Sequence, residues 1–283
     1  MVNIQVRPAD LNDHQRLSNL IFFETRFHRH LDWRQPLEWL GEKFFWAVDE
    51  GAQITAALAC PEEVNGIAWV RLFVHSGYWS AENAWAVLWE VAKQDIARAG
   101  GATVAAITQH AWFEKVLVLN GFKHRQNIVM LEWLHQPWAS GEADGIRIRK
   151  MTEADIPAVV VVDHAAFDPL WHNSLDTLSR AFSQSLFAMV AEDESGVIGY
   201  QITTGSGLRA HLARLAVHSS VQGRGVGRAL LGDLFFGLEQ NGYFKVSVNT
   251  QSDNETSLHL YQRMGFVRTG EIYPVYTFDV PGS

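Results

Sequence analysis

The second half of the chain alternates runs typical of strands with apolar periodicities typical of helices. Two-residue alternation predicts five strands, at 146–150, 186–193, 197–204, 210–218 and 243–250. Apolar residues recur at helical spacing after Thr152, after Ser174, after the glycine run at 223–227 and after Asn254, and a bent strand pair is expected over 265–278. This order of elements is typical of a mixed α/β sheet.

Three stretches of the first half recur, in the same order, in the second half. The offsets between the partners rise only from 142 to 144, and the matches are RLFVHS (71–76) with RLAVHS (214–219), NIQVRPADLND (3–13) with GIRIRKMTEAD (145–155), and LNGF (119–122) with RMGF (263–266). Such a series indicates a tandem duplication. We therefore expect two α/β domains, residues 1–140 and 145–283, joined by the Pro-, Gly- and acid-rich stretch at 135–145.

Composition narrows the class of protein. The net charge of −8 argues against a nucleic-acid partner, and no apolar run reaches the roughly 18 residues of a membrane span. The N-terminus has no basic-then-apolar leader, so a cytoplasmic protein is expected. Cys60 is the only cysteine, which excludes an internal disulfide and a cysteine-rich metal site, and no metal is expected.

The run VQGRGVGRALL at 221–231 places three glycines, Gly223, Gly225 and Gly227, between a predicted strand and a predicted helix. Glycines allow unusual backbone angles and close approach, and successive N–H groups at a helix N-terminus bind anions. Arg224 and Arg228 can add charge-assisted contacts. The spacing fits neither the dinucleotide-binding pattern nor the Walker loop. The alternative is a tight turn that serves packing only.

Two motifs of the second half resemble the GNAT N-acetyltransferase superfamily. The first is Gln222-x-x-Gly225-x-Gly227, and the second is Asn254 followed by Tyr261, Gly265 and Phe266. The resemblance covers about 145–280 and implies two tandem GNAT-like domains, with a layout similar to that of mycothiol synthase. It also implies acetyl-CoA as co-substrate, bound by residues Leu215, Val217, Gln222, Gly223, Arg224, Gly225, Val226, Gly227, Arg228 and Asn254.

In this family an amine attacks the thioester directly, and no protein nucleophile is needed. The resemblance makes Tyr261 the acid that protonates the leaving thiolate, although the same residue could be a packed aromatic of its helix. For the base we consider His211, which a period of two would place on the same strand face as Val217. The alternative is a histidine at a strand end with no catalytic role.

The amine acceptor is expected to be a small molecule or a peptide. By resemblance its site lies between the first two helices of the domain and the last strands, where Asp168, Trp171 and Glu271 are candidates. Either carboxylate could pair with a cationic amine, or could simply be a solvated surface group.

The first copy has lost these features. Aligned on the repeat, Glu82 and Ala84 replace the motif glycines Gly225 and Gly227, and Leu117 replaces Tyr261. Ten of the eleven tryptophans precede residue 142. We expect a catalytically silent copy in which Trp85 and Trp89 pack the core or fill the vacated cleft; an aromatic ligand cavity is the alternative.

Two classes of function remain. The leading hypothesis is an acetyl-CoA-dependent N-acetyltransferase. The alternative is a non-catalytic acyl-CoA-binding sensor, in which one copy reports to the other.

Overall fold

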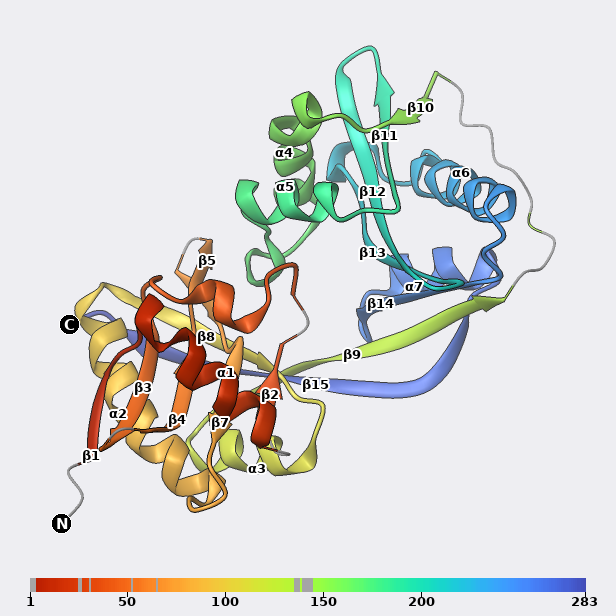
Figure 1. Ribbon diagram of the computed structural model, residues 1–283. Helices are drawn as coiled ribbons and strands as arrows, with labels where there is room; N and C mark the ends of the chain where they lie inside the picture. Colours follow the sequence, from red (N-terminus) through yellow and green to blue (C-terminus); the bar gives the residue numbers. More distant parts are fainter. Residues whose placement is uncertain are drawn as a thin grey trace. The chain divides into compact units, whose positions relative to one another are not determined.

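The computed structural model describes residues 4–24, 27–30, 32–51, 53–64, 66–134, 138 and 145–283. These residues form two compact units: unit 1 contains residues up to Gln126 together with Tyr273–Ser283, and unit 2 contains Asn127–Ile272. Figure 1 shows the elements of both in colours that follow the sequence. Each unit is an α/β structure, as the hydrophobic pattern predicts.

Unit 1 has two sheets with helices packed against them. The strand order in one sheet is β1-β3-β4-β7-β2, and the other contains β15, β8, β6 and β5. The elements are β1 Ile4–Pro8, α1 His14–Phe23, β2 Phe27–Arg29, β3 Phe45–Glu50, β4 Gln53–Ala59, β5 Glu62–Val64, β6 Ile67–Trp69, β7 Leu72–His75, α2 Ala81–Arg98, β8 Gly101–Ile107 and α3 Ala111–Leu119, with short 3-10 turns at Leu11–Asp13 and Pro36–Trp39.

Unit 2 is built on a sheet with the order β10-β11-β12-β13-β14-β9. Its elements are β10 Arg147–Lys150, α4 Ile156–Ala166, α5 Leu175–Ser183, β11 Phe187–Asp193, β12 Gly196–Ser206, β13 Arg209–Val217, α6 Val226–Gln240, β14 Lys245–Gln251 and α7 Glu255–Arg263, with 3-10 turns at Glu153–Asp155, Pro169–Trp171 and Ser219–Val221. Two further strands, β9 Lys123–Leu134 and β15 Val267–Pro281, have residues in both units. Ser174 and Asn254, which precede two of the predicted helices, cap α5 and α7, because each side chain accepts a hydrogen bond from the backbone N–H three residues later.

Each unit takes one strand from the other half of the sequence. Strand β9 pairs antiparallel with β14 over Ile128–Leu134, within unit 2, while β15 pairs antiparallel with β8 over Val275–Pro281, within unit 1. Both appear in Figure 1 as long strands.

The compact units divide at Gln126/Asn127 and again before Tyr273. The domain bounds expected from the repeat, 1–140 and 145–283, stay a prediction. One expectation about secondary structure changes. The bent strand pair expected at 265–278 is wrong, because β15 is one strand of 15 residues. Most of the predicted linker at 135–145 lies outside the described residues.

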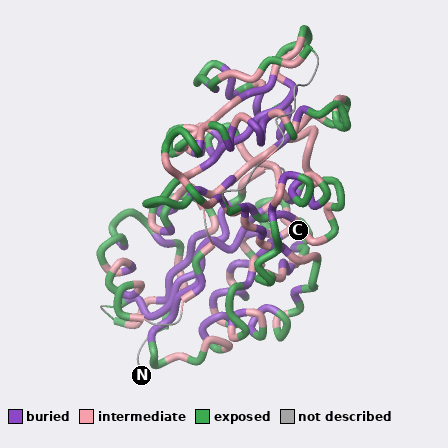
Figure 2. Tube along the Cα trace, turned by 90° about the vertical axis from the view of Figure 1, so that its right-hand side faces the viewer, coloured by how far each residue is buried: buried purple, intermediate pink, exposed green. Residues whose placement is uncertain are grey.

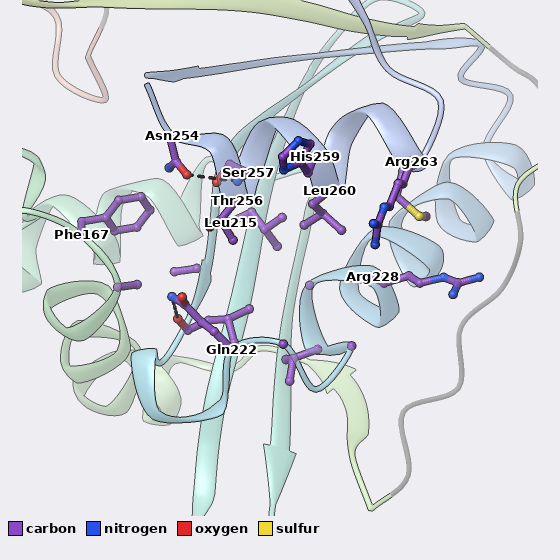
Figure 3. A pocket seen from close by; sticks show the side chains of 18 residues that line it. Phe167, Leu215, Gln222, Arg228, Asn254, Thr256, Ser257, His259, Leu260 and Arg263 are labelled. Carbon is purple, nitrogen blue, oxygen red and sulfur yellow. Dashed lines mark hydrogen bonds between the residues drawn. The ribbon is translucent and has the colours of Figure 1, made fainter. Parts of the chain in front are cut away.

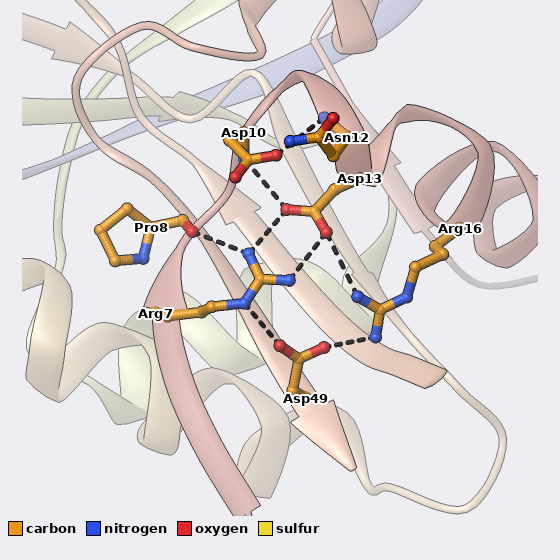
Figure 4. Close-up of polar contacts among 7 residues, drawn as sticks. All are labelled: Arg7, Pro8, Asp10, Asn12, Asp13, Arg16 and Asp49. Carbon is orange, nitrogen blue, oxygen red and sulfur yellow. Dashed lines mark hydrogen bonds and ion pairs between the residues drawn. The ribbon is translucent and has the colours of Figure 1, made fainter. Parts of the chain in front are cut away.

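One polar cluster appears in both units and supports the duplication. In unit 1, the guanidinium of Arg7 donates to both oxygens of Asp13 at 2.7 Å and to Asp49 at 2.5 Å (Figure 4). In unit 2, Arg149 donates to both oxygens of Asp155 at 2.8 Å and to Glu192 at 2.7 Å. The arginine and the first aspartate are identical in the two clusters, and the third position is a carboxylate in both. This match in residue type and geometry indicates that the two units have a common origin.

Separate apolar cores hold the two units. Figure 2 shows buried residues concentrated along the strands. In unit 1 the core is aromatic: Trp85 and Trp89 on α2 are 0% and 2% exposed, with ring centroids 5.6 Å apart. Their expected role in core packing is confirmed. In unit 2, Trp133 of β9 stacks on Phe235 of α6 at 4.2 Å, so the exchanged strand contributes directly to the core.

Candidate active site

The site begins where two parallel strands of unit 2 separate. Strands β13 and β14 pair only from Arg209 to Leu212, although β13 continues to Val217. The separation follows a bulge, because the pairing of β13 with β12 shifts at Ala213, and an extra residue bends a strand and increases its twist. Beyond the bulge, one edge of β13 has therefore lost its neighbour.

The free edge of β13 presents backbone groups at alternate residues. The N–H of His218 bonds to Ile198 on the β12 side, so the N–H and C=O of Leu215 and Val217 point to the opposite side. The carbonyl of Val217 accepts a hydrogen bond of 3.1 Å from Nε2 of Gln222. A ligand with amide groups can pair with this edge as an added strand would.

The glycine loop closes one end of the gap. Gly223 and Gly225 have φ values of +81° and +85°, in the left-handed region that disfavours other residues, and Gly225 is the N-cap of α6. Gly227 allows close packing of α6 on α7, since a Cβ there would lie 2.9 Å from Cδ2 of Leu260 and would displace that side chain. The loop therefore places the N-terminus of α6, with the N–H groups that have no partner within the helix, at the opening between β13 and β14.

Together these elements enclose a cleft of about 820 Å³ (Figure 3). The side chains that line the cleft include Arg228, His259 and Arg263 and, in the part of the chain that the structure describes, no carboxylate. Arg224 lies elsewhere, 3.4 Å from Asp193. In a chain with a net charge of −8, a cleft lined in this way favours an anionic ligand.

Helix α7 carries the second motif. Asn254 lines the cleft while its Oδ1 accepts from the N–H of Ser257 at 3.0 Å. Tyr261 is 4% exposed and packs on Phe266, and the residues that line the cleft include its neighbour Leu260 but not Tyr261 itself. Burial raises the pKa of Tyr261, with the charge of Arg214 opposing the shift. The phenol is therefore protonated at neutral pH.

The expected face of His211 is wrong. A period of two would place His211 and Val217 on one face of β13, but the extra residue at Ala213 reverses the alternation between them. His211 lies instead on the face of Ser247, whose Oγ is 2.9 Å from its Nδ1. Burial lowers the pKa of His211, which keeps the ring neutral near pH 7. Its catalytic role stays a prediction.

The acceptor candidates do not converge on the cleft. Asp168 caps the 3-10 turn at Pro169–Trp171 by accepting from the N–H of Leu170, Trp171 precedes His172 in the same segment, and Glu271 lies exposed on β15 beside Thr269. Phe167, next to Asp168, does line the cleft. Their role in binding an acceptor remains a prediction.

Sequence reasoning missed a buried polar cluster formed by Asp163, Tyr200 and Arg214. Asp163 is completely buried, and its carboxylate accepts from Tyr200 Oη at 2.5 Å and from Arg214 Nε at 2.8 Å. A charged residue inside the apolar run of residues 156–166 was the available signal, since a buried carboxylate needs a cationic partner.

The corresponding place in unit 1 is chemically different. Helix α2 begins after Ser80, and Glu82 in its first turn forms an ion pair of 3.0 Å with Lys115. A carboxylate in that turn repels an anion where unit 2 presents glycine N–H groups. Among the described residues, no helix is long and apolar enough to cross a membrane, and no group of three His, Cys, Asp or Glu is placed to hold a metal.

Residues 184–268 match the family model of the acetyltransferase (GNAT) domain. Unit 2 therefore contains a GNAT domain. The matched segment runs from the end of α5 to the start of β15, and so includes the diverging strands, the glycine loop and the motif of α7. The family resemblance stated from the sequence is confirmed for this domain.

Two curated relatives support the assignment. The chain is 27% identical to mycothiol acetyltransferase of Propionibacterium freudenreichii subsp. shermanii over 145 residues, 46% of each protein. It is 28% identical to N-alpha-acetyltransferase 30 of Schizosaccharomyces pombe over 95 residues, 32% of this chain and 63% of the relative. The matches thus cover 46% and 63% of the length of these two relatives, less than two thirds of each.

Solved structures extend the likeness to both units of the chain. A GCN5-related N-acetyltransferase from Sphaerobacter thermophilus is 18% identical with a TM-score of 0.64, over 99% of this chain and 97% of that one. A tandem GNAT protein from the clavulanic acid biosynthesis pathway is 14% identical with a TM-score of 0.65, over 99% and 100%. At these identities the likeness establishes the fold alone, and it does so over both units of the chain.

Proposed function

We propose that the protein is an acetyl-CoA-dependent N-acetyltransferase that acts on an amine of a small molecule or peptide, with acetyl-CoA bound in the cleft of unit 2. The observation that carries the proposal is the combination of a free strand edge at Leu215 and Val217 with a glycine loop at a helix N-terminus. Acetyl-CoA matches this combination, because it carries amide groups along its arm and a pyrophosphate at one end.

Each part of the cleft then has a task. The N–H groups of the loop and of the first turn of α6 bind the pyrophosphate, and Arg228 adds positive charge. The edge of β13 pairs with the amides of the arm and offers an N–H to the oxyanion that forms when the amine attacks the thioester carbon. Asn254, the cap of α7, lies along the same path.

Acetyl transfer also requires two proton movements. The amine nitrogen forms a bond to the acetyl carbon, loses a proton to a base, and the carbon–sulfur bond breaks. The thiolate that leaves takes a proton, for which we propose Tyr261, because it stands next to the cleft residue Leu260 on α7 and carries a phenol proton at neutral pH. We propose His211 as the base, directly or through water, because its ring is neutral near pH 7.

Calorimetry with acetyl-CoA tests the binding site. We expect one site per chain, because the loop of unit 1 carries Glu82 in the first turn of α2. Gly225→Glu copies that feature into unit 2 and should abolish binding, since it adds both a carboxylate and a side chain at a φ of +85°. Two sites, or unchanged binding in this variant, would contradict the assignment.

Thiol release separates the enzyme from a sensor. Acetyl-CoA is incubated with the protein and a panel of amines and peptides, and free CoA is measured with a thiol reagent. Amine-dependent release supports the transferase. Tight binding without release on any acceptor would favour a non-catalytic acyl-CoA sensor.

A further inference from the structure

The strongest unassigned feature of unit 2 is the buried cluster around Arg214. This side chain is 15% exposed and leaves β13 directly after the bulge, beside the cleft residue Leu215. Its Nε and Nη2 lie 2.8 Å and 2.7 Å from Oδ2 of Asp163 on α4. Burial alone would lower the pKa of Arg214, but the Asp163 carboxylate holds it above the ordinary value. The guanidinium is therefore a permanent charge inside the unit.

Arg214 also contacts the segment that links α4 to α5. Its Nη2 donates to the carbonyl of Trp171 at 2.6 Å, and its Cζ lies 3.6 Å from the ring centroid of Phe167. Phe167 lines the cleft, so the aromatic wall at this end rests directly on the guanidinium. A planar group with several donors makes both contacts at once, whereas an ammonium cannot.

The same segment is folded around the cluster by three further hydrogen bonds. The N–H of Asn173 donates to Asp163 at 3.0 Å, Nε2 of His172 bonds to the carbonyl of Phe167 at 3.0 Å, and Nε2 of His164 bonds to the carbonyl of Asn173 at 3.0 Å. The two histidine rings stack with centroids 4.2 Å apart. Residues 167–173 are thus held at both ends, since Arg214 contacts Phe167 and Trp171 while Asp163 and His164 of α4 bond Asn173, and His172 links back to Phe167 within the segment.

We propose that Arg214 is a positioning residue for the acceptor, which fixes residues 167–173 and keeps Phe167 against the cleft. Asp163 orients the guanidinium, and since its charge is neutralised there, it does not itself attract a cationic amine. The role rests on the proposed transferase function, because it assigns the acceptor side of that same cleft. It predicts that loss of the guanidinium fork weakens acceptor binding and leaves the glycine loop intact.

The duplication supplies a matched control. Arg71 occupies the repeat position of Arg214 in unit 1, its side chain is 8% exposed, and it contacts Asp32 at 3.4 Å and Glu63 at 3.1 Å. Lysine at either position keeps the positive charge but lacks the planar guanidinium with its several N–H donors. Both substitutions should lower the melting temperature. R71K therefore shows what a loss of stability alone does to the measured constants.

Two readouts then decide the role of Arg214. With an amine that the wild type acetylates, R214K should raise the KM for that amine by about tenfold or more, while the Kd for acetyl-CoA changes less than about threefold and R71K changes neither constant by more than that. An R214K variant with an unchanged amine KM would overturn the proposal. Equal increases in both variants would overturn it as well, because the effect would then be general destabilisation.

The second readout needs no acceptor. Chymotrypsin should cut R214K within residues 167–172, after Phe167 or Trp171, as detected by mass spectrometry on the intact chain without ligand. R71K and the wild type should resist at those bonds. If no amine is acetylated by the wild type, the proposed function fails, whereas resistance of R214K at 167–172 refutes the positioning role itself.

Discussion

The left-handed backbone of the glycine loop allows a quantitative test of cofactor binding. Gly223 has a φ of +81°, and a Cβ built there meets no atom within 4 Å, so Gly223→Ala introduces backbone strain without a clash. Gly242, after the end of α6, offers a matched control with a φ of +71° and equally open space. A non-glycine residue in this conformation costs roughly 1–2 kcal/mol.

The two variants should differ in how the strain is relieved. The exposed loop around Gly223 can leave the left-handed conformation in the free protein, and acetyl-CoA must then restore it, which raises Kd by about 5- to 30-fold for roughly 1–2 kcal/mol. Gly242 is fixed by the hydrogen bond from Tyr243 to Leu238, so Gly242→Ala should lower the melting temperature and leave Kd unchanged. Calorimetry and thermal melts measure both quantities. If Gly223→Ala bound acetyl-CoA within twofold of the wild type, the anion-binding role of this backbone would be refuted.

Three further predictions concern other parts of the chain. Tyr261→Phe should lower kcat by about 100-fold or more with little change in acetyl-CoA Kd, since an acid acts only as the thiolate leaves; a loss below about threefold, with chemistry rate-limiting, removes Tyr261 from that role. Burial lowers the pKa of His28 to about 4 from an ordinary value of 6.5. As the pH falls, the His28 ring therefore takes up its proton in the unfolded chain before it does so in the folded one. The free energy of unfolding should fall by up to about 3 kcal/mol between pH 6.5 and 4. In denaturant titrations, His28→Gln should show a weaker dependence of the free energy of unfolding on pH than the wild type. A fragment of residues 127–272 should be monomeric in size-exclusion chromatography, whereas 145–283 should aggregate because β14 lacks β9; equal solubility would refute this reading of the exchange.

The sequence predicts the fold class, the repeat and the glycine loop because each depends on local periodicity or on residues adjacent in the chain. The face of His211 was mistaken because a single bulge residue, Ala213, reverses strand alternation and leaves no mark in the apolar pattern. The cluster of Asp163, Tyr200 and Arg214 was missed because its members are 37 and 51 residues apart along the chain. The partners of β9 and β15 were equally hidden, since strand pairing between distant segments depends on the tertiary structure.

The pairing of β15 with β8 also determines when unit 1 can complete its fold during synthesis of the chain. Strand β8 cannot pair with β15 until the chain has been synthesised to Asp279, which lies 176 positions after its partner Thr103. Unit 1 therefore leaves the ribosome with an unpaired strand edge and an incomplete aromatic core, and it acquires β15 only after residues 127–272 of unit 2 have been translated. Such distant contacts slow folding and prolong exposure of the sticky intermediate. The unit whose strands are made first is thus the one that is completed last.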